Sequence, residues 1–237
     1  MSHERGTIEY PGLGCIVVTR NSRARRITMR CRDGRIFMTV PECATTADIS
    51  RALAQCGDKL KAMQEKSTPQ IIDKEFSITT ERFSLRIREN STNCTTVTGK
   101  DGAYIIECPQ SSDYSNGYVQ EGLRRCIKGA LKHCAKSYLP KRLHELAMKH
   151  GFRYSRCSVR DVHSRWGSCS TRGDISLSIY MMMLPGRLVD YVLLHELCHT
   201  VEMNHDAAFW ELLDKCTAPE KAMVLRKELK GFRNGLS

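Results

Sequence analysis

The stretch HELCHTVEMNH, from His195 to His205, contains three of the chain's eight histidines. His195 and His199 are four residues apart, so on a helix they lie about one turn apart on one face and can bind a single ion. Glu196 is turned to the side, where its carboxylate can reach a water molecule near that ion without being a ligand. Two imidazole ligands, an open coordination position and a general base are typical of a zinc-dependent hydrolase.

A zinc ion needs a third protein ligand, and His205 is the first candidate. On a continuing helix His205 would lie about 15 Å along the axis from His195 and on the wrong side. The helix must therefore end before His205, and we expect the chain to turn at Glu202–Asn204. Asn204 suits that turn because asparagine tolerates the left-handed conformation. The alternative third ligands are later carboxylates, Glu220 and Glu228.

Neighbouring side chains are candidates for supporting roles. We expect Phe209 and Trp210 to pack in the core and hold the third ligand in place. Cys198 points away from the ligand face of the helix and is interpreted as a core residue. A carboxylate can accept a hydrogen bond from a ligand imidazole, and two are near enough in sequence to do so. These two are Asp190 and Asp206.

The segment RWGSCS, residues 165–170, comes before the metal-binding helix. An edge strand at this place could pair with an extended peptide substrate. Alternatively, Trp166 packs in the core and the Gly-Ser pair after it forms a turn. Arg165 is our candidate for stabilising an oxyanion. His163 has no partner at a ligand spacing, so we interpret it as a surface or core histidine.

Composition limits the class of protein. The chain has 237 residues, 41% of them apolar, which allows one large domain or two small ones. It has no secretory signal and no apolar segment that could span a bilayer. Twelve cysteines without a CxxC pair argue against a zinc ribbon and favour reduced, mostly buried thiols in a cytoplasmic protein.

The net charge of +11 is uneven, with 20 basic and 12 acidic side chains in residues 115–237. A helix predicted near residues 118–138 carries a basic stripe along it. The stripe is either a solvated face or a surface for weak, non-specific nucleic-acid binding. Its residues are Arg124, Arg125, Lys128, Lys132 and Lys136.

The hydrophobic pattern predicts an α+β protein. Residues 25–40 alternate around Asp33-Gly34, which predicts a β-hairpin, and a helix follows to about Lys66. No internal repeat stands out. The polar segment 110–117 predicts a boundary between a β-rich N-terminal domain with one helix, residues 1–110, and a catalytic domain, residues 115–237. In the catalytic domain we expect a helix that Pro140 ends, a shorter helix to Met148 and strands joined by a Gly/Ser-rich turn. The remaining expected elements are strands 157–165 and 174–180, a helix after Pro185 through the HExxH motif, and helices 206–215 and 219–230.

These motifs together resemble the YgjP-like metallopeptidase family. The resemblance rests on RWGSCS, YVLLHELCH and NHDAAFW in residues 115–237, and on RARRITMRCRDGRIFMTVP near the N-terminus. It implies a zincin-like catalytic domain with an HExxH helix, in which His195, His199 and His205 bind Zn²⁺ and Glu196 is the catalytic base. It also implies kinship with SprT-like and Wss1-like proteases that act on DNA-bound proteins.

We therefore expect a zinc-dependent metallopeptidase that cleaves protein or peptide substrates with a metal-activated water. Two alternatives stay open: a nucleic-acid-associated zinc protein that acts on DNA-bound proteins, and a zinc hydrolase of a non-peptide amide. We expect no membrane partner, and the sequence carries no signal for an oligomeric state.

Overall fold

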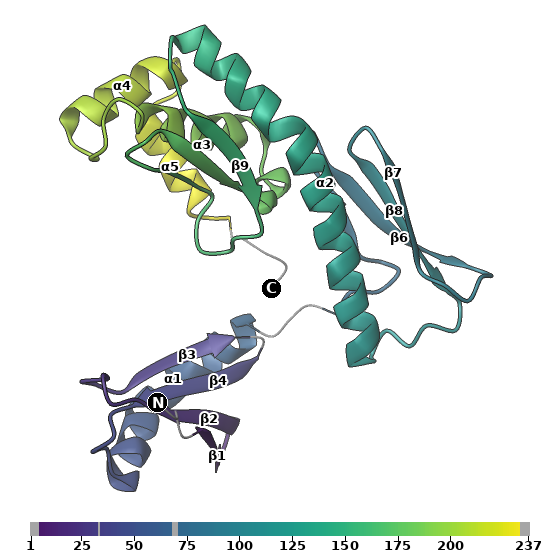
Figure 1. Cartoon of the computed structure of the whole chain (residues 1–237). Helices are drawn as coiled ribbons and strands as arrows, with labels where there is room; N and C mark the ends of the chain where they lie inside the picture. Colours follow the sequence, from purple (N-terminus) through teal and green to yellow (C-terminus); the bar gives the residue numbers. More distant parts are fainter. Residues whose placement is uncertain (1–4, 33, 68–70, 233–237) are drawn as a thin grey trace. The chain divides into compact units, whose positions relative to one another are not determined.

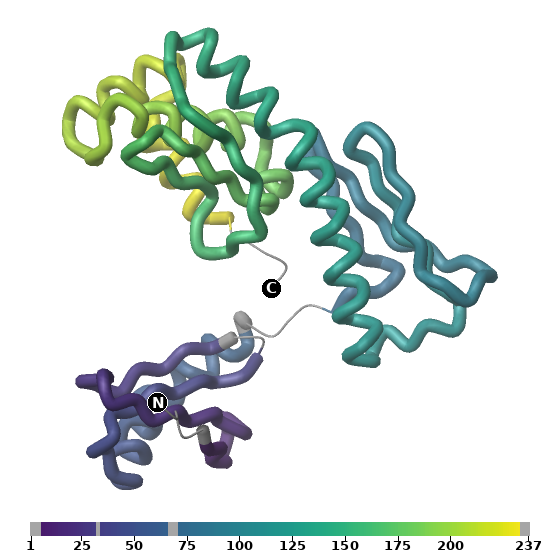
Figure 2. Tube along the Cα trace, in the orientation of Figure 1, coloured from purple at the N-terminus to yellow at the C-terminus, as the bar shows by residue number. Residues whose placement is uncertain are grey.

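The computed structural model describes residues 5–32, 34–67 and 71–232 and divides the chain near residue 70 into two compact units (Figures 1 and 2). We call them the N-terminal unit and the C-terminal unit. The boundary expected at residues 110–117 falls inside the C-terminal unit. That polar segment is the loop that starts a helix: the Asn116 side chain accepts a hydrogen bond from the backbone N–H of Tyr118.

The N-terminal unit is a four-stranded sheet with one helix on one face. The strand order is β1-β2-β4-β3, with β2 and β4 parallel and the other pairs antiparallel. Alternate side chains of the strands point at the helix and form a core that includes Ile16, Ile36 and Leu53. The elements are β1 (Arg5–Tyr10), β2 (Gly14–Arg20), β3 (Thr28–Arg32), β4 (Arg35–Val40) and α1 (Thr46–Ser67).

The expected hairpin and helix of this unit are present. Strands β3 and β4 form the hairpin, although Asp33 of its turn lies outside the described residues. Helix α1 begins after Thr45, whose hydroxyl accepts a hydrogen bond from the backbone N–H of Asp48. The Asp48 carboxylate accepts one from the backbone N–H of Thr45 in return, so the two residues cap the helix together.

The C-terminal unit begins with a second four-stranded sheet, of order β5-β6-β8-β7. Its apolar side chains, among them Leu85, Ile87 and Ile106, are buried. The hairpin turn at Asp101-Gly102 has positive φ at both residues, 52° and 86°, as a tight hairpin requires. The strands are β5 (Ser77–Thr79), β6 (Ser84–Asn90), β7 (Thr96–Lys100) and β8 (Ala103–Pro109).

One long helix, α2 (Gly117–His150), replaces the two helices expected here. The prediction that Pro140 ends the helix was wrong, because Pro140 lies inside α2. Proline inside a helix costs about 3 kcal/mol. The buried stripe that includes Leu139, Leu143 and Leu146 continues past it, and burial of each leucine stabilises the helix by roughly 1.5–3 kcal/mol.

A small third sheet carries the RWGSCS segment. Two strands were expected, and three are present: β9 (Arg156–Arg160), β10 (Gly167–Cys169) and β11 (Asp174–Ser178). Strand β11 is central, antiparallel to β10 and parallel to β9. The turn of the β10–β11 hairpin is Ser170–Gly173, not the Gly-Ser pair after Trp166, which begins β10.

Three helices complete the unit: α3 (Gly186–Cys198), α4 (Ala207–Thr217) and α5 (Ala222–Leu229). All were expected from the sequence within a few residues. Within the described residues, none of the helices has both the length and the apolar character that a bilayer crossing requires.

All twelve cysteines are free thiols. The expectation that most of them are buried was wrong, because only Cys108, Cys134 and Cys198 are buried.

Candidate metal centre

Helix α3 presents the HExxH motif and then stops at once. Its apolar residues before the motif, including Leu193 and Leu194, are buried, which makes the helix a fixed platform. The helix ends at Cys198, and the next turn is closed by backbone bonds from Val201 and Glu202 to the Cys198 carbonyl (3.0 and 2.8 Å). The helix therefore ends before His205, as expected.

The reversal occurs at residues 199–201, earlier than the expected turn at Glu202–Asn204. Asn204 does not adopt the left-handed conformation that we expected, since Asp101 is the non-glycine residue with positive φ among those described. The Thr200 hydroxyl donates a hydrogen bond to the Leu197 carbonyl (2.7 Å) and satisfies one of the free acceptors at the helix end.

The reversal brings the three expected imidazoles together. Nε2 of His195 lies 3.2 Å from Nε2 of His199 and 3.1 Å from Nε2 of His205. Among the described residues, these three histidines are the cluster whose ligand atoms can hold one ion. Nitrogens bound to a tetrahedral zinc at about 2.0–2.1 Å are about 3.4 Å apart, so the two separations from His195 are close to those around such an ion. All three ligand atoms lie within 4.8 Å of one another.

The protonation of the imidazoles suits metal binding. Burial, with the neighbouring imidazoles, lowers the pKa of His195 to about 3, and burial lowers the pKa of His205. Both rings are therefore neutral near pH 7 and offer a lone pair. Nδ1 of His199 lies 3.0 Å from the Glu202 carbonyl, which can only accept a hydrogen bond. This contact places the proton on Nδ1 and leaves Nε2 of His199 free to be a ligand.

Phe209 on α4 packs against all three imidazoles. Its ring centroid lies 5.0, 4.6 and 4.7 Å from those of His195, His199 and His205, and the side chain is fully buried. Trp210 stacks on His205 and donates its indole N–H to the His205 carbonyl (3.2 Å). The expectation that these aromatics hold the third histidine therefore agrees with the contacts, although Trp210 is only half-buried.

Glu196 is buried beside the imidazoles, with 5% of its surface exposed. Burial raises the pKa of Glu196 to about 8, and the positive charge of Arg165 opposes the shift. Strand β10 crosses close to this carboxylate: a Cβ added to Gly167 would stand 2.7 Å from Glu196 Oε1. Gly167 is thus a site residue that sequence reasoning assigned to a turn, and the glycine in RWGSC was its only signal.

The other carboxylates weighed from the sequence are occupied elsewhere. Glu220 and Glu228, the alternative third ligands, both pair with Arg187. Asp190 accepts two hydrogen bonds from Arg142 on α2 (2.8 and 2.6 Å).

Asp206 caps α4 through the backbone N–H of Phe209 (3.1 Å). Neither Asp190 nor Asp206 bonds an imidazole, so the expectation of a carboxylate partner was wrong. Cys198 is a buried core residue, as expected.

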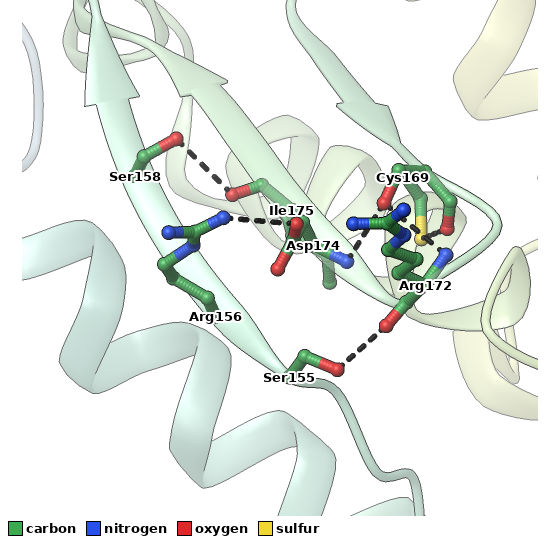
Figure 3. Close-up of polar contacts among 8 residues, drawn as sticks. Ser155, Arg156, Ser158, Cys169, Arg172, Asp174 and Ile175 are labelled. Atoms are coloured by element: carbon green, nitrogen blue, oxygen red, sulfur yellow. Dashed lines mark hydrogen bonds and ion pairs between the residues drawn. The ribbon is translucent and has the colours of Figure 1, made fainter.

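A groove of about 460 Å³ lies over the third sheet. Its floor is polar because alternate residues of β9, β10 and β11 present serine hydroxyls, for example Ser158, Ser168 and Ser176. Figure 3 shows how this floor is tied together: Arg156 pairs with Asp174 (3.0 Å), and the Ser158 hydroxyl points to the Ile175 carbonyl.

Two aromatic or basic residues of the RWGSCS segment also line this groove. Trp166 is half-buried at the groove rather than in the core, and Arg165 is exposed beside it. His163, interpreted from the sequence as a surface or core histidine, is exposed and contacts the Tyr180 hydroxyl through Nε2 (2.8 Å). Tyr180 in turn donates to Asp161 (2.8 Å), so His163 belongs to a small polar cluster at the end of β11.

One family of known proteins matches most of the chain. The family model described as YgjP-like, metallopeptidase domain, matches residues 25–231. None of the curated proteins matches the chain. Two crystal structures of metallopeptidase zymogens are similar: Pyrococcus abyssi abylysin (21% identity, TM-score 0.36) and Methanocaldococcus jannaschii jannalysin (17%, 0.35). Each covers 39% of this chain, over 92% and 94% of its own length.

Proposed function

We propose, from the premise that this chain belongs to the YgjP-like metallopeptidase family, that it is a zinc-dependent peptidase. In this proposal His195, His199 and His205 hold the ion and Glu196 is the general base. One observation carries the proposal. The Nε2 atoms of His199 and His205 lie 3.2 and 3.1 Å from Nε2 of His195, beside the buried carboxylate of Glu196.

The reaction that these residues support is hydrolysis of a peptide bond. Zinc in the imidazole cluster supplies a Lewis acid that lowers the pKa of a water molecule and polarises the scissile carbonyl. A cation held by the three imidazoles would favour the ionised form of Glu196. The Glu196 carboxylate would then accept the proton of the attacking water and give that proton to the leaving amine. Burial keeps this carboxylate out of bulk solvent, and its contact with Gly167 fixes where it points.

The third sheet offers a place for an extended substrate. Strand β10 pairs with β11 on one side only, so its other edge is available among the described residues for a peptide to add as a further strand. Substrate side chains then reach the serine-lined groove, where Arg160 and Arg165 favour acidic or polar groups. Arg165 is also our candidate for the oxyanion, because its charge already acts on Glu196.

The decisive experiment replaces Glu196→Gln and compares metal content and cleavage of an unfolded protein. Glutamine keeps the size of the side chain but cannot accept a proton, so we expect the metal to stay and the rate to fall by about 10²- to 10⁴-fold. Glu211→Gln on α4 is the matched control, because Glu211 is exposed and outside the cluster.

Metal content provides the second arm. Purified protein should contain about one zinc per chain, and His205→Ala should lose most of it. If His205→Ala keeps the metal while Glu220→Ala loses it, the ligand set is different. If wild type cleaves small non-peptide amides but no peptide, the site is a zinc hydrolase of another class. Full activity of Glu196→Gln would remove Glu196 from the reaction.

A further inference from the structure

The two four-stranded sheets have the same architecture, although they share no obvious sequence repeat. In each sheet the four strands follow the order first-second-fourth-third, and the second and fourth strands are parallel. In each sheet the third and fourth strands form a hairpin, and a helix follows. We call residues 5–67 the first β-module and residues 77–138 the second β-module.

Corresponding residues can be assigned from the strand register. Ile16 pairs with Ile36 in the first module, and Leu85 pairs with Tyr104 in the second. An asparagine lies at or directly after the end of the second strand in each module, and its side chain accepts a hydrogen bond from the backbone N–H two residues later. These asparagines are Asn21 and Asn90. Each module also has Asp-Gly between its third and fourth strands and a proline at or directly after the end of its fourth strand, Pro41 and Pro109.

The two modules differ sharply in charge over one corresponding segment. Residues 20–35 of the first module contain seven arginines and one acidic residue. The corresponding residues 89–103 of the second module contain one lysine and two acidic residues. Because the second module builds the same strands without them, the strands do not require most of these arginines. Arg20 is an exception, since its guanidinium donates hydrogen bonds to the carbonyls of Glu42 and Ala44.

Among the arginine side chains of this segment that the structure describes, five are exposed: Arg23, Arg25, Arg26, Arg30 and Arg35. We call these five the arginine surface. No ion pair holds any of them among the residues that the structure describes. Arg30 and Arg35 lie on β3 and β4, and Arg23, Arg25 and Arg26 lie in the loop before β3. Exposed cations gathered in this way repel one another, and an anionic partner relieves that repulsion.

An exposed aromatic ring lies beside Arg30 of this surface. Phe37 is 39% exposed and directly opposite Arg30 across the β3–β4 hairpin. Both side chains lie on the sheet face away from α1, because Met29, Cys31 and Met38 beside them pack into the core. An acidic residue on that face, Glu9, lies on β1 at the opposite edge of the sheet.

We propose that the arginine surface with Phe37 binds single-stranded nucleic acid. Guanidinium groups bind phosphates through two parallel hydrogen bonds and stack on bases, and all the basic residues of this segment are arginine. An exposed ring between cations on an open sheet is a platform on which a base can stack. An acidic peptide would satisfy the arginines but would not use the ring.

This surface replaces the basic stripe of α2 as the main nucleic-acid site. In the stripe, Lys128 pairs with Asp161 (3.4 Å) and Arg125 lies 4.0 Å from Glu121. Part of the positive charge of the stripe is therefore already neutralised by the protein itself.

The test uses the full chain and a labelled single-stranded oligonucleotide at several salt concentrations. The variant Arg23→Thr/Arg30→Thr/Arg35→Ala installs the residues that the second module has at Thr92, Thr98 and Ala103. We expect its affinity to fall about tenfold or more at low salt, and the slope of log affinity against log salt to fall by about 2, since each phosphate contact contributes about 0.7. The melting temperature should stay near wild type.

Two further variants separate the alternatives. Phe37→Ile installs the residue that the second module has at Ile105, and it should weaken single-strand binding about fivefold or more through lost stacking. The control Arg125→Ala/Lys132→Ala/Lys136→Ala removes the same charge from α2 and should leave affinity near wild type.

The proposal is overturned if wild type binds no oligonucleotide at low salt, or if the α2 control loses binding while the arginine variant keeps it. It is also overturned if polyglutamate competes as well as the oligonucleotide and Phe37→Ile has no effect, because the partner is then an acidic protein. The experiment does not depend on peptidase activity, so it stands or falls separately from the proposed function.

Discussion

Gly167 is the residue whose replacement tests the position of the catalytic base most directly. A Cβ at residue 167 would lie 2.7 Å from both Cγ and Oε1 of Glu196, and 2.9 Å from its Cδ. Non-bonded heavy atoms pack best at about 3.5–4.0 Å, so the Gly167→Ala variant must move the carboxylate by about 1 Å. Glu196 is only 5% exposed, so its side chain has little room to move away without disturbing its neighbours.

A displacement of about 1 Å in a catalytic group can reduce the rate about 10²-fold, which corresponds to about 2.7 kcal/mol of transition-state stabilisation. We expect kcat/KM of Gly167→Ala for an unfolded protein substrate to fall by about this factor. Metal content should not change, because the three atoms nearest to the new methyl group belong to Glu196 and not to an imidazole.

Gly129→Ala is the matched control, since a Cβ there meets nothing within 4 Å. Gly129 lies inside α2, so this change should stabilise the protein by about 0.5–1 kcal/mol and leave activity unchanged. Measurements of kcat/KM, zinc content and melting temperature on both variants complete the assay. Wild-type activity in Gly167→Ala would refute the packing of β10 against the base, and zinc loss would show that the strand supports the ligands instead.

Two other predictions concern α4. Phe209→Ala should destabilise the protein by about 3–5 kcal/mol and weaken zinc affinity about 10- to 100-fold in chelator competition, because it removes the ring that supports all three imidazoles. Phe209→Leu should lose less stability and less zinc affinity. Unchanged zinc affinity in Phe209→Ala would contradict this supporting role. The hydrogen bond from the backbone N–H of Ala222 (2.7 Å) lowers the pKa of Asp214 below its ordinary 3.8. The ionised Asp214 carboxylate therefore stabilises the folded protein fully above about pH 4, and this stabilisation is lost as pH falls through the lower folded pKa. Asp214→Asn should therefore lower the melting temperature at pH 7 and close the gap to wild type in acid, and a gap that persists below the folded pKa would show that the carboxylate charge is not responsible.

Features that depend on one element could be predicted from the sequence. The spacing of His195 and His199 alone places both rings on one helix face, and the helix pattern is local. The need for a third ligand then required a helix end before His205, and the chain does reverse there. The residues at which the chain reverses could not be predicted from the sequence. They are set by backbone hydrogen bonds from residues 200–202 to the carbonyls of the last helical turn, and not by the conformational tolerance of Asn204.

The prediction at Pro140 failed for a related reason. Proline is a local signal, and its cost of about 3 kcal/mol decides the outcome only when nothing larger opposes it. In α2 the residues on both sides of Pro140 continue one buried stripe against the rest of the unit, for example Leu139 and Leu143. Those contacts are made with other elements of the unit, so a prediction from the helix sequence alone made the helix too short.

The β-modules show why structure is needed to find some functional residues. Their core positions preserve only apolar character, such as Ile36 against Tyr104 and Met38 against Ile106, so a repeat is hard to recognise from letters. Once the strand register aligns them, the paired strand residues of one module have counterparts in the other. The five arginines of the arginine surface have no basic counterpart in the second module, so the fold does not explain them. Their explanation must be sought in what that surface binds.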